Sequence, residues 1–425
     1  MIQSFNKITK VKGTLTFKGD KSISHRALLI SSLAKGKSII KNLSESDDVK
    51  STIKCLIDLG IQVEYKNGIH SITGKGYKGF HASQKSLDAG NSGTTARLLT
   101  GILSAQNFES EIIGDKSLST RPMNRIIEPL TQMGTNLNSN NGKLPIKISS
   151  SNNFRAINYF LPVPSAQVKS SILLAGLHLD EQSSVVETTA ARNHTENLLG
   201  LSVERDGTKI KSFVSRKNYP DAKEYFIPGD VSSAMFFIVL ALIVRDSELI
   251  IKDISLNPTR TECLNILKQM GGRIQIDLKG VSNNEVFGDV IVKSSRLSNI
   301  IIRKEIIPLI IDEIPILAIA GIFADGNYEL RGASELRVKE SDRIKAICKN
   351  LLKIGLTIDE HEDGFSVIGL PKNIAQTFES FYDHRIAMAF AILSSLLDSG
   401  GNVDKFECVS VSNPGFLNQL RAVSS

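Results

Sequence analysis

GDKSISHRALLISSLA, residues 19–34, joins a polar turn to an apolar run that is rich in small side chains. The same combination, a polar and often Gly-containing turn followed by an apolar helical run, recurs along the chain. The other copies are GNSGTTARLLTGILSA (90–105), VPSAQVKSSILLAGL (163–177), PGDVSSAMFFIVLAL (228–242), DEIPILAIAGIFADG (312–326) and DHRIAMAFAILSSLL (383–397). Six copies indicate internal symmetry, and a chance echo of ordinary α/β patterning is the weaker explanation.

A second pattern follows most of these helices. It is an amphipathic helix that ends at Gly, after which the two-residue alternation of a strand begins. We find it in IKCLIDLGIQVE (53–64), IEPLTQMGTNLN (127–138), NHTENLLGLSVE (193–204), LNILKQMGGRIQID (264–277) and LLKIGLTIDE (351–360). The third copy is the weaker match, because Leu201-Ser202-Val203 follows Gly200. The sixth copy is PGFLNQLRAV (414–423).

These two patterns predict the fold class. A repeat of strand, buried helix, strand, exposed helix and strand can bury its apolar helix only against neighbouring repeats. Three repeats around one helical core make a domain, so six repeats make two domains. We therefore expect an α/β protein of two similar domains, each with three repeats around buried helices.

Composition narrows the class of protein. The chain has 41% hydrophobic and 22% charged residues, as ordinary globular proteins do. The net charge of +7 suits anionic ligands, but Lys and Arg are scattered, so nucleic-acid binding is not favoured. The four cysteines lie far apart, the N-terminal segment has no signal-peptide core, and the apolar run 234–244 is too short to span a membrane. We expect a soluble cytoplasmic protein.

The polar turns before the buried helices contain the candidate binding residues. Helix N-termini with Gly, Ser and Thr bind anions, and neighbouring cations strengthen the site. One by one, the hydroxyls could be plain N-caps and the basic residues solvated surface positions. Taken together, turns that repeatedly place Lys or Arg beside Ser, Gly or Asn favour a polyanionic ligand. The residues are Lys21, Ser22, Arg26, Asn91, Gly93, Arg97, Arg121, Arg125, Ser165, Gln167, Lys169 and Arg385.

Two acids stand out among these cations. Asp312 interrupts the apolar stretch IIPLIIDEIPILAIAGIFA, where a carboxylate must be paired, cap a helix or serve function. Glu340 lies between Lys339 and Arg343 in RVKESDR. A partly buried acid among cations suits proton transfer near neutral pH. No HExxH, GxxxxGK[ST] or strand-linked GxGxxG occurs, so we predict no metal and no nucleotide cofactor.

Along essentially the whole chain, these motifs closely resemble one family. It is the 3-phosphoshikimate 1-carboxyvinyltransferases, also called 5-enolpyruvylshikimate-3-phosphate synthases. The segments that resemble the family are GDKSISHRALL, AGNSGTTARLL, LSTRPMNRIIEPL, PSAQVKSSILLAGL, PGDVSSA, DEIP, ELRVKESDR and DHRIAMAFA.

The resemblance implies an inside-out α/β barrel architecture, with three βαβαββ units in each of two domains. Domain I would comprise residues 1–20 and 229–425, domain II residues 21–228, and the active site would lie in the cleft between them. The implied reaction transfers the enolpyruvyl group of phosphoenolpyruvate to the 5-hydroxyl of shikimate 3-phosphate and releases phosphate. It needs no cofactor and belongs to chorismate and aromatic amino-acid biosynthesis. We expect the chain to act as a monomer.

The resemblance also implies roles for individual residues. Shikimate 3-phosphate would contact Lys21, Ser22, Arg26, Ser165, Ala166, Gln167 and Lys339, with Arg192 as a weaker candidate. Phosphoenolpyruvate would contact Gly93, Arg121, Arg343 and Arg385, with Lys21 and Gln167 reaching it too and Asn91 shaping the pocket. Asp312 would be the base for the substrate hydroxyl and Glu340 the acid for the methylene carbon, and Lys21 would share in proton transfer.

Two other functions compete with this one. The sister enzyme, UDP-N-acetylglucosamine 1-carboxyvinyltransferase, usually has a Cys before its RP motif, and EIIGDKSLSTRPM (111–123) has none. A non-catalytic anion-binding protein on the same scaffold would gain from losing the acids Asp312 and Glu340, which this chain retains.

RVKESDR (337–343) can be interpreted as a helix start with Lys339 and Arg343 on one face, which by itself is unfavourable. Ser341 would cap that helix, and Arg337 would pair with Asp342. Substrate anions would offset the repulsion between the two cations.

Overall fold

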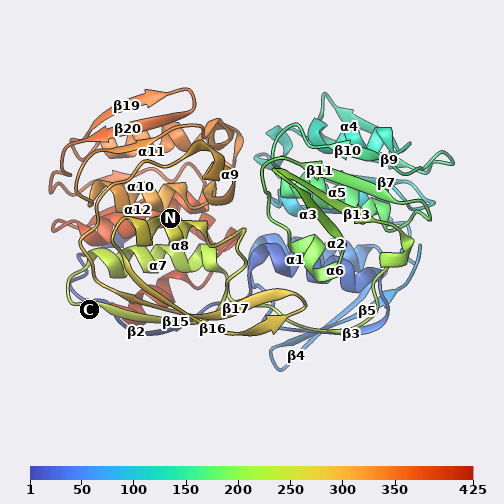
Figure 1. Cartoon of the computed structure of the whole chain (residues 1–425), viewed down its shortest axis with the longest axis horizontal. Coiled ribbons are helices and arrows are strands. Elements are labelled where there is room, and N and C mark those ends of the chain that lie inside the picture. Colours follow the sequence, from blue (N-terminus) through green and yellow to red (C-terminus); the bar gives the residue numbers. More distant parts are fainter. Residues whose placement is uncertain (425) are drawn as a thin grey trace. The chain divides into compact units, whose positions relative to one another are not determined.

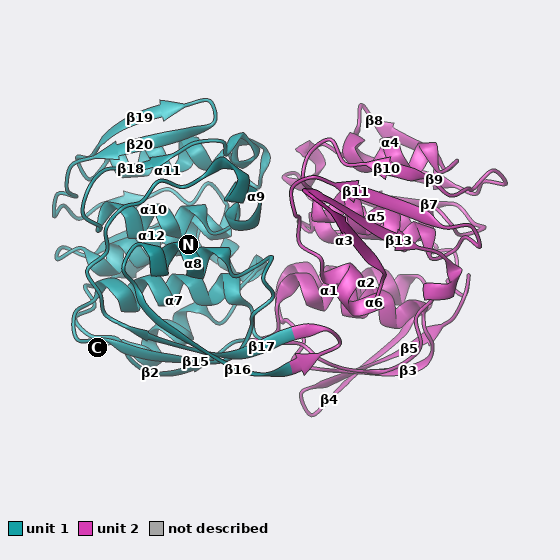
Figure 2. Cartoon of the chain, viewed as in Figure 1, with its two compact units in different colours: residues 1–17, 229–280, 286–425 teal, residues 18–228, 281–285 magenta. Residues whose placement is uncertain are grey.

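The computed structural model describes residues 1–424 of the chain, which form two compact units (Figure 2). Unit 1 comprises residues 1–17, 229–280 and 286–425, and unit 2 comprises residues 18–228 and 281–285. The chain thus passes between units after Phe17 and after Pro228, and the domain boundaries expected at residues 20 and 228 stay predictions. No helix in the described part of the chain is long and apolar enough to cross a membrane.

Six helices are buried over nearly their whole length, and each coincides with one copy of the first sequence pattern. Their sequences are apolar or small on all sides, as expected of helices enclosed by other elements. In unit 2 they are α1 (Lys21–Leu33), α3 (Gly93–Leu103) and α5 (Ala166–Gly176). In unit 1 they are α7 (Val231–Ile243), α10 (Ile314–Ile322) and α12 (His384–Leu396).

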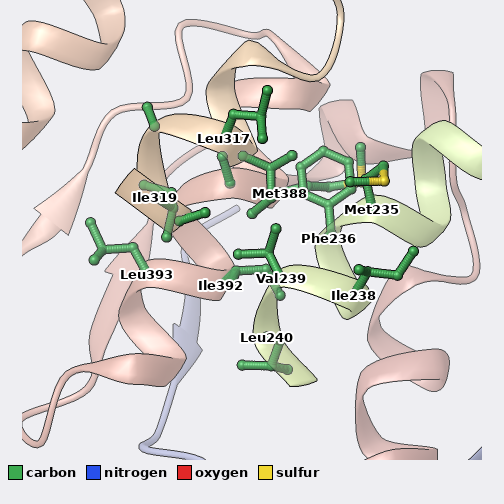
Figure 3. Close-up of a cluster of buried hydrophobic side chains, with 14 of the residues drawn as sticks. Met235, Phe236, Ile238, Val239, Leu240, Leu317, Ile319, Met388, Ile392 and Leu393 are labelled. Carbon is green, nitrogen blue, oxygen red and sulfur yellow. The ribbon is translucent and has the colours of Figure 1, made fainter. Parts of the chain in front are cut away.

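The core of unit 1 is built where its three buried helices meet. Helices α7, α10 and α12 contact one another pairwise. Figure 3 shows side chains of all three helices in this cluster, among them Phe236, Leu317 and Met388. Unit 2 has a hydrophobic core of its own around α1, α3 and α5. The two cores share no residue, so each unit buries its own apolar surface.

A partly exposed helix follows each buried one, as the second sequence pattern predicts. These are α2 (Asp47–Asp58), α4 (Asn124–Gln132), α6 (His194–Leu199), α8 (Glu262–Gln269), α11 (Arg343–Leu352) and α13 (Phe416–Val423). Five of them end at a Gly with positive φ, for example Gly60 (φ 85°) and Gly271 (φ 100°). Only Gly adopts this conformation without steric cost, which explains its recurrence. A short extra helix, α9 (Ile307–Ile310), precedes α10.

Unit 2 contains three four-stranded sheets of identical topology. In each, a first strand runs parallel to the second, and the remaining pairs are antiparallel. The first is β14 (Glu224–Phe226), β3 (Lys35–Lys41), β5 (Ile69–Lys75) and β4 (Gln62–Lys66). The second is β6 (Leu87–Asp88), β7 (Ser110–Ile113), β9 (Lys143–Ser149) and β8 (Asn136–Asn140). The third is β10 (Asn158–Phe160), β11 (Ser183–Glu187), β13 (Lys209–Val214) and β12 (Val203–Asp206). Figure 1 labels strands of each of them, for example β3, β7 and β11.

Unit 1 also has three sheets, of which two have three strands and one has four. The four-stranded sheet is β2 (Lys12–Thr16), β15 (Glu248–Ser255), β17 (Glu285–Lys293) and β16 (Arg273–Ser282), and α7 packs on β15. The others are β18 (Tyr328–Leu330), β20 (Gly364–Ile368) and β19 (Thr357–His361), and β1 (Gln3–Phe5), β22 (Gly401–Val403) and β21 (Thr377–Phe378). The fold prediction of two similar α/β domains with three repeats each is confirmed. The three sheets of each unit are separate, and in the described part of the chain they do not join into a closed barrel.

Candidate active site

The candidate residues of unit 2 gather at the N-termini of its buried helices. Arg26 near the start of α1 bonds Ser170 in α5, and Gln167 at the start of α5 bonds Thr94 at the start of α3. Three helix N-termini are therefore close together, and each contributes partial positive charge and N–H donors. This arrangement favours an anionic ligand.

Lys21 is the first residue of α1 and is held by an acid that the sequence did not single out. Its Nζ donates to Asp48 Oδ2 at 2.9 Å, and both side chains are largely shielded from solvent. Asp20 caps the helix by accepting from the N–H of Ile23, and Ser22 follows Lys21 at the same helix start. The Lys21 ammonium thus has a fixed place at the N-terminus of α1.

Arg26 is buried and fully oriented by three oxygen atoms. It donates from Nε to Thr195 Oγ1 and from Nη2 to Ser170 Oγ, both at 2.8 Å, and from Nη1 to the carbonyl of Ser22. Burial lowers the pKa of Arg26 to about 10, with Glu196 and Asp20 opposing the shift. The guanidinium therefore remains a cation at neutral pH.

Around the start of α3, two predicted residues contact each other. Arg121 donates from Nη2 to Asn91 Oδ1 at 2.7 Å, and Asn91 donates to Asp115 Oδ2 at 2.8 Å. A Cβ on Gly93 would lie 2.6 Å from Arg97 Nη1 and 3.7 Å from Arg121 Nη1. The missing side chain of Gly93 therefore leaves room for the Arg97 guanidinium, while Arg121 lies at ordinary contact distance.

The start of α5 contains the remaining predicted residues of unit 2. Ser165 caps the helix by accepting from the N–H of Val168, and Ala166 is the first helical residue. Gln167 accepts from Arg97 Nη1 at 2.8 Å and donates to Thr94 Oγ1 at 3.0 Å. Gln167 thereby ties the start of α5 to that of α3.

Lys169, one turn further along, has a structural role. It is 1% exposed and its Nζ lies 2.7 Å from both Glu187 Oε1 and Glu196 Oε1. Burial lowers the pKa of Lys169, but the two carboxylates outweigh it and raise the pKa overall. This buried triad joins α5 to β11 and to α6, which contains Thr195, a partner of Arg26.

In unit 1, one buried guanidinium gathers three carboxylates. Arg343 is 1% exposed, and it donates from Nε to Asp383 Oδ2 at 2.8 Å, from Nη2 to Glu340 Oε2 at 2.5 Å and from Nη1 to Asp312 Oδ1 at 3.3 Å. Burial lowers the pKa of Arg343, but Asp383, Glu340 and Asp312 together raise it above its ordinary value. The two candidate proton-transfer acids thus share one cation.

Arg385, in the first turn of α12, adjoins the same group. Its Nη1 donates to the Asp312 carbonyl at 2.7 Å and to Ser232 Oγ at 2.8 Å, and its Nη2 lies 3.7 Å from Asp312 Oδ2. Asp312 directly precedes the start of α10, where Glu313 occupies the cap position without a side-chain cap bond. The Asp312 carboxylate forms ion pairs with two arginines, Arg343 and Arg385.

The segment RVKESDR differs from its expected helix. Ser334–Val338 forms a 3₁₀ turn, Lys339 is half-buried at its end, and α11 begins only at Arg343. Lys339 and Arg343 thus do not share a helical face. The N-cap is Asp342, not Ser341, which donates to Asp383 Oδ2 instead. A helix that begins at Arg343 can use Asp342 as its N-cap, so this start is more favourable than one that places Arg343 in the second turn. The expected helix start did not take this cap into account.

Arg337 and Asp342 form the predicted structural pair, with Nη1 and Oδ2 2.8 Å apart. Arg337 also reaches Glu360 Oε1 at 3.1 Å. The predicted pairing of these two residues is confirmed.

Sequence reasoning missed the acids and hydroxyls that hold the cations. Asp383, Asp48, Thr195 and Ser232 contact Arg343, Lys21, Arg26 and Arg385, respectively. For Asp383 and Ser232, the available signal was a polar residue directly before or inside the first turn of a buried helix, as in DHR and GDVSS. Asp48 and Thr195 lie in the partly exposed helices α2 and α6, where this signal does not apply. Among residues 1–424, no group of three or more His, Cys, Asp or Glu side chains is arranged to hold a metal ion.

The chain matches known proteins over its full length. The family model described as EPSP synthase (3-phosphoshikimate 1-carboxyvinyltransferase) matches residues 5–420. The 3-phosphoshikimate 1-carboxyvinyltransferase of Petrotoga mobilis is 46% identical over 422 residues, 98% of either chain. That of Salinibacter ruber is 42% identical over 428 residues, 100% of either chain.

Solved structures give the same result. The EPSP synthase from Acinetobacter baumannii has a TM-score of 0.86 and 38% identity, covering 100% of this chain and 98% of that chain. The enolpyruvyl transferase NikO from Streptomyces tendae has a TM-score of 0.74 at 11% identity, covering 100% of this chain and 97% of that chain. The likeness to NikO concerns the fold alone.

Proposed function

Because this chain belongs to the EPSP synthase (3-phosphoshikimate 1-carboxyvinyltransferase) family, we propose that it transfers the enolpyruvyl group of phosphoenolpyruvate to the 5-hydroxyl of shikimate 3-phosphate. Phosphate is the second product. The reaction is a step of the shikimate pathway toward chorismate and the aromatic amino acids. The family resemblance seen in the sequence motifs is confirmed by these matches.

One observation supports the chemistry most directly: two carboxylates lie on one buried guanidinium. Asp312 and Glu340 contact different nitrogens of Arg343, which places them within reach of one small substrate. Addition to phosphoenolpyruvate needs a base for the attacking hydroxyl and an acid for the methylene carbon. Two neighbouring acids with different surroundings supply both groups.

The first step forms the tetrahedral intermediate. Asp312 accepts the proton of the 5-hydroxyl while the hydroxyl oxygen attacks C2 of phosphoenolpyruvate. At the same time C3 takes a proton from Glu340. In the second step C3 returns its proton to Glu340, the C2–O bond to phosphate breaks, and the enolpyruvyl double bond re-forms. Asp312 gives the proton that it took from the hydroxyl to the leaving phosphate. Lys21 shares in these proton transfers.

Glu340 must be protonated before it can act as the acid. Its carboxylate is paired with the Arg343 guanidinium, and a neighbouring cation favours the ionised form of a carboxyl group. The carboxylate or phosphate of phosphoenolpyruvate competes for the same guanidinium. Substrate binding to Arg343 therefore weakens the pair and makes a proton on Glu340 more favourable.

The proposed binding residues divide between the two substrates. Lys21, Ser22, Arg26, Ser165, Ala166, Gln167 and Lys339 bind shikimate 3-phosphate. Gly93, Arg121, Arg343 and Arg385 bind phosphoenolpyruvate, with Asn91 holding Arg121 in place. Because these residues belong to both units, we propose that both units act on one pair of substrates. Preorganised cations around the leaving phosphate stabilise the charge that develops there.

Phosphate release tests the proposed function. We expect release from phosphoenolpyruvate with shikimate 3-phosphate and none with UDP-N-acetylglucosamine, the acceptor of the alternative that the matches do not favour. A chain without activity toward shikimate 3-phosphate would refute the proposal. Activity toward neither acceptor, with phosphoenolpyruvate still bound, would support a non-catalytic anion-binding protein.

We further propose that the protein works as a monomer in the cytoplasm. Its four cysteines are buried free thiols, which suits a reducing compartment. Sedimentation velocity at assay concentrations tests the monomer, and cell fractionation tests the location.

A further inference from the structure

A buried polar cluster lies directly behind Arg385, at the start of helices α7, α10 and α12. It consists of Ser232, Arg260, Glu313 and the cap Asp230, all buried. None of these residues belongs to the proposed substrate-binding set. Charged groups are rarely enclosed in this way unless their interactions compensate for the loss of hydration.

The hydrogen bonds in this cluster have a fixed direction. Arg385 Nη1 donates to Ser232 Oγ at 2.8 Å, and the Ser232 hydroxyl donates to Glu313 Oε1. An ionised carboxylate only accepts, and a hydroxyl has a single proton. Because that proton goes to Glu313, the lone pairs of Ser232 are left to accept from Arg385.

This relay fixes one nitrogen of Arg385 and leaves another for a ligand. The two N–H groups of Nη1 are directed to Ser232 Oγ and to the Asp312 carbonyl. Nη2 lies 3.7 Å from Asp312 Oδ2, beyond hydrogen-bond distance. The guanidinium is thus anchored at one edge, while Nη2 can donate to a substrate anion.

Glu313 also balances the local charge. Its Oε1 lies 3.5 Å from Arg385 Nη1 and 3.7 Å from Arg260 Nη1, and Arg260 Nη2 lies 3.7 Å from Asp230 Oδ1. A neutral side chain at position 313 would leave two buried guanidinium groups with less compensation. Arg385 would then be drawn toward Asp312, the proposed base.

We propose that Glu313 is a positioning residue, which acts through the Ser232 hydroxyl to hold Arg385 in the orientation that binds phosphoenolpyruvate. The inference rests on the proposed function, in which Arg385 contacts that substrate. Asp312 and Glu313 are neighbours in the sequence, but they have separate tasks: one transfers a proton and the other aligns a binding group.

A double-mutant cycle with Glu313→Gln and Ser232→Ala tests the relay. We expect each single variant to raise KM for phosphoenolpyruvate about tenfold, with KM for shikimate 3-phosphate unchanged and kcat lowered less than threefold. The double variant should be no worse than the more affected single variant, because both changes break one chain of bonds. Ser233→Ala is the matched control, since Ser233 is a buried neighbour on α7 whose side chain is outside the relay.

Two results would overturn the relay in an active wild-type chain. One is an unchanged KM for phosphoenolpyruvate in the single variants, and the other is fold-changes that multiply in the double variant. If Glu313→Gln does not fold, Ser232→Thr decides, because it keeps the hydroxyl. We expect its KM for phosphoenolpyruvate to be close to that of the wild type and below that of Ser232→Ala. Equal KM values in Ser232→Thr and Ser232→Ala would refute the relay. A wild-type chain that releases no phosphate would instead refute the proposed function, and this inference with it.

Discussion

At the scale of single residues, Arg343 explains how two acids can lie close together. Two neighbouring carboxylates repel each other, and a buried guanidinium with three acidic partners removes that cost. Asp383 binds Arg343 through two oxygens and also caps α12. Arg343 is therefore anchored to the fold through Asp383, and its contacts with Asp312 and Glu340 are the ones that a substrate anion can replace.

Glu340→Gln tests the proposed acid. The amide keeps the shape of the side chain but cannot deliver the proton to C3, so we expect kcat to fall by about 10²–10⁴-fold. KM for either substrate should change less than fivefold, because Arg343 keeps its bonds to Asp383. Steady-state kinetics with both substrates varied provide the measurement.

Glu360→Gln is the control for that experiment, because Glu360 pairs with Arg337 outside the proposed site. Its kinetics should equal those of the wild type. If Glu340→Gln retains more than a tenth of the wild-type kcat, Glu340 is not the acid.

His178 predicts how stability depends on pH. Burial lowers its pKa to about 4, and its ring packs against Tyr77 and Tyr219. The unfolded chain binds a proton on His178 near the ordinary pKa, whereas the folded chain does so only near pH 4. The contribution of neutral His178 to the free energy of unfolding is therefore complete above about pH 6.5 and is lost as the pH falls toward 4. At pH 5 the loss is about 2 kcal/mol from this residue alone.

Urea unfolding at pH 7.5 and pH 5 measures this loss. We expect His178→Asn to lower stability at both pH values but to show a difference between them that is about 2 kcal/mol smaller than in the wild type. His81→Asn, at an exposed position, should leave the wild-type difference intact. An equal pH difference in His178→Asn and wild type would show that His178 binds its proton in the folded chain.

At the scale of elements, small residues set how closely the buried helices approach. A Cβ on Gly101 in α3 would lie 2.3 Å from the carbonyl oxygen of Ser171 in α5. The Ser171 hydroxyl donates to the Arg97 carbonyl at 3.0 Å, so the same contact fixes the turn that contains Arg97. The spacing of α3 and α5 therefore determines where Arg97 and Gln167 meet.

Gly101→Ala tests this spacing. Backbone cannot move aside as a side chain can, so α3 and α5 must separate, and we expect a loss of about 1–3 kcal/mol despite the better helix propensity of Ala. KM for phosphoenolpyruvate should rise as the Arg97–Gln167 contact is disturbed. Chemical unfolding and kinetics provide the two measurements.

Gly415→Ala is the control for Gly101→Ala, because its new Cβ would meet atoms only at 3.5 Å or more. It should change stability by less than about 1 kcal/mol. A Gly101→Ala protein as stable as this control would show that α3 and α5 are not close-packed at this point.

The elements also show why sequence predicted so much of the fold. Helix patterns such as AMFFIVLALIV are apolar on every side, and the recurrent Gly at helix ends has a conformation that only Gly favours, so both features are local. Pairings between distant residues are not local: Lys21 with Asp48, Arg26 with Thr195 and Arg385 with Ser232 follow only from how the helices pack. For the same reason the sequence identified the candidate acids and cations but missed Glu313 as a partner of Ser232.

At the scale of the whole molecule, each unit has the parts of an independent domain. Unit 2 has its own core, three sheets and helices α1 to α6, and all but five of its residues lie in one continuous stretch, 18–228. The other five, residues 281–285, include Glu285, which accepts hydrogen bonds from His194 Nδ1 at 2.8 Å and Asn197 Nδ2 at 3.2 Å. This short segment completes the burial of α6.

We therefore expect residues 18–228 alone to fold with native-like helix content and cooperative urea unfolding. Stability should be lower than in the full chain by about 1–3 kcal/mol, because His194 and Asn197 lose an acidic partner. The fragment should release no phosphate, since Asp312, Glu340, Arg343 and Arg385 are absent. Far-UV circular dichroism and urea titration measure the first two outcomes.

Leu28→Asp, which places a charge in the core of the same fragment, should abolish the unfolding transition. A wild-type fragment that behaves like Leu28→Asp would show that the core of unit 2 is not sufficient for folding.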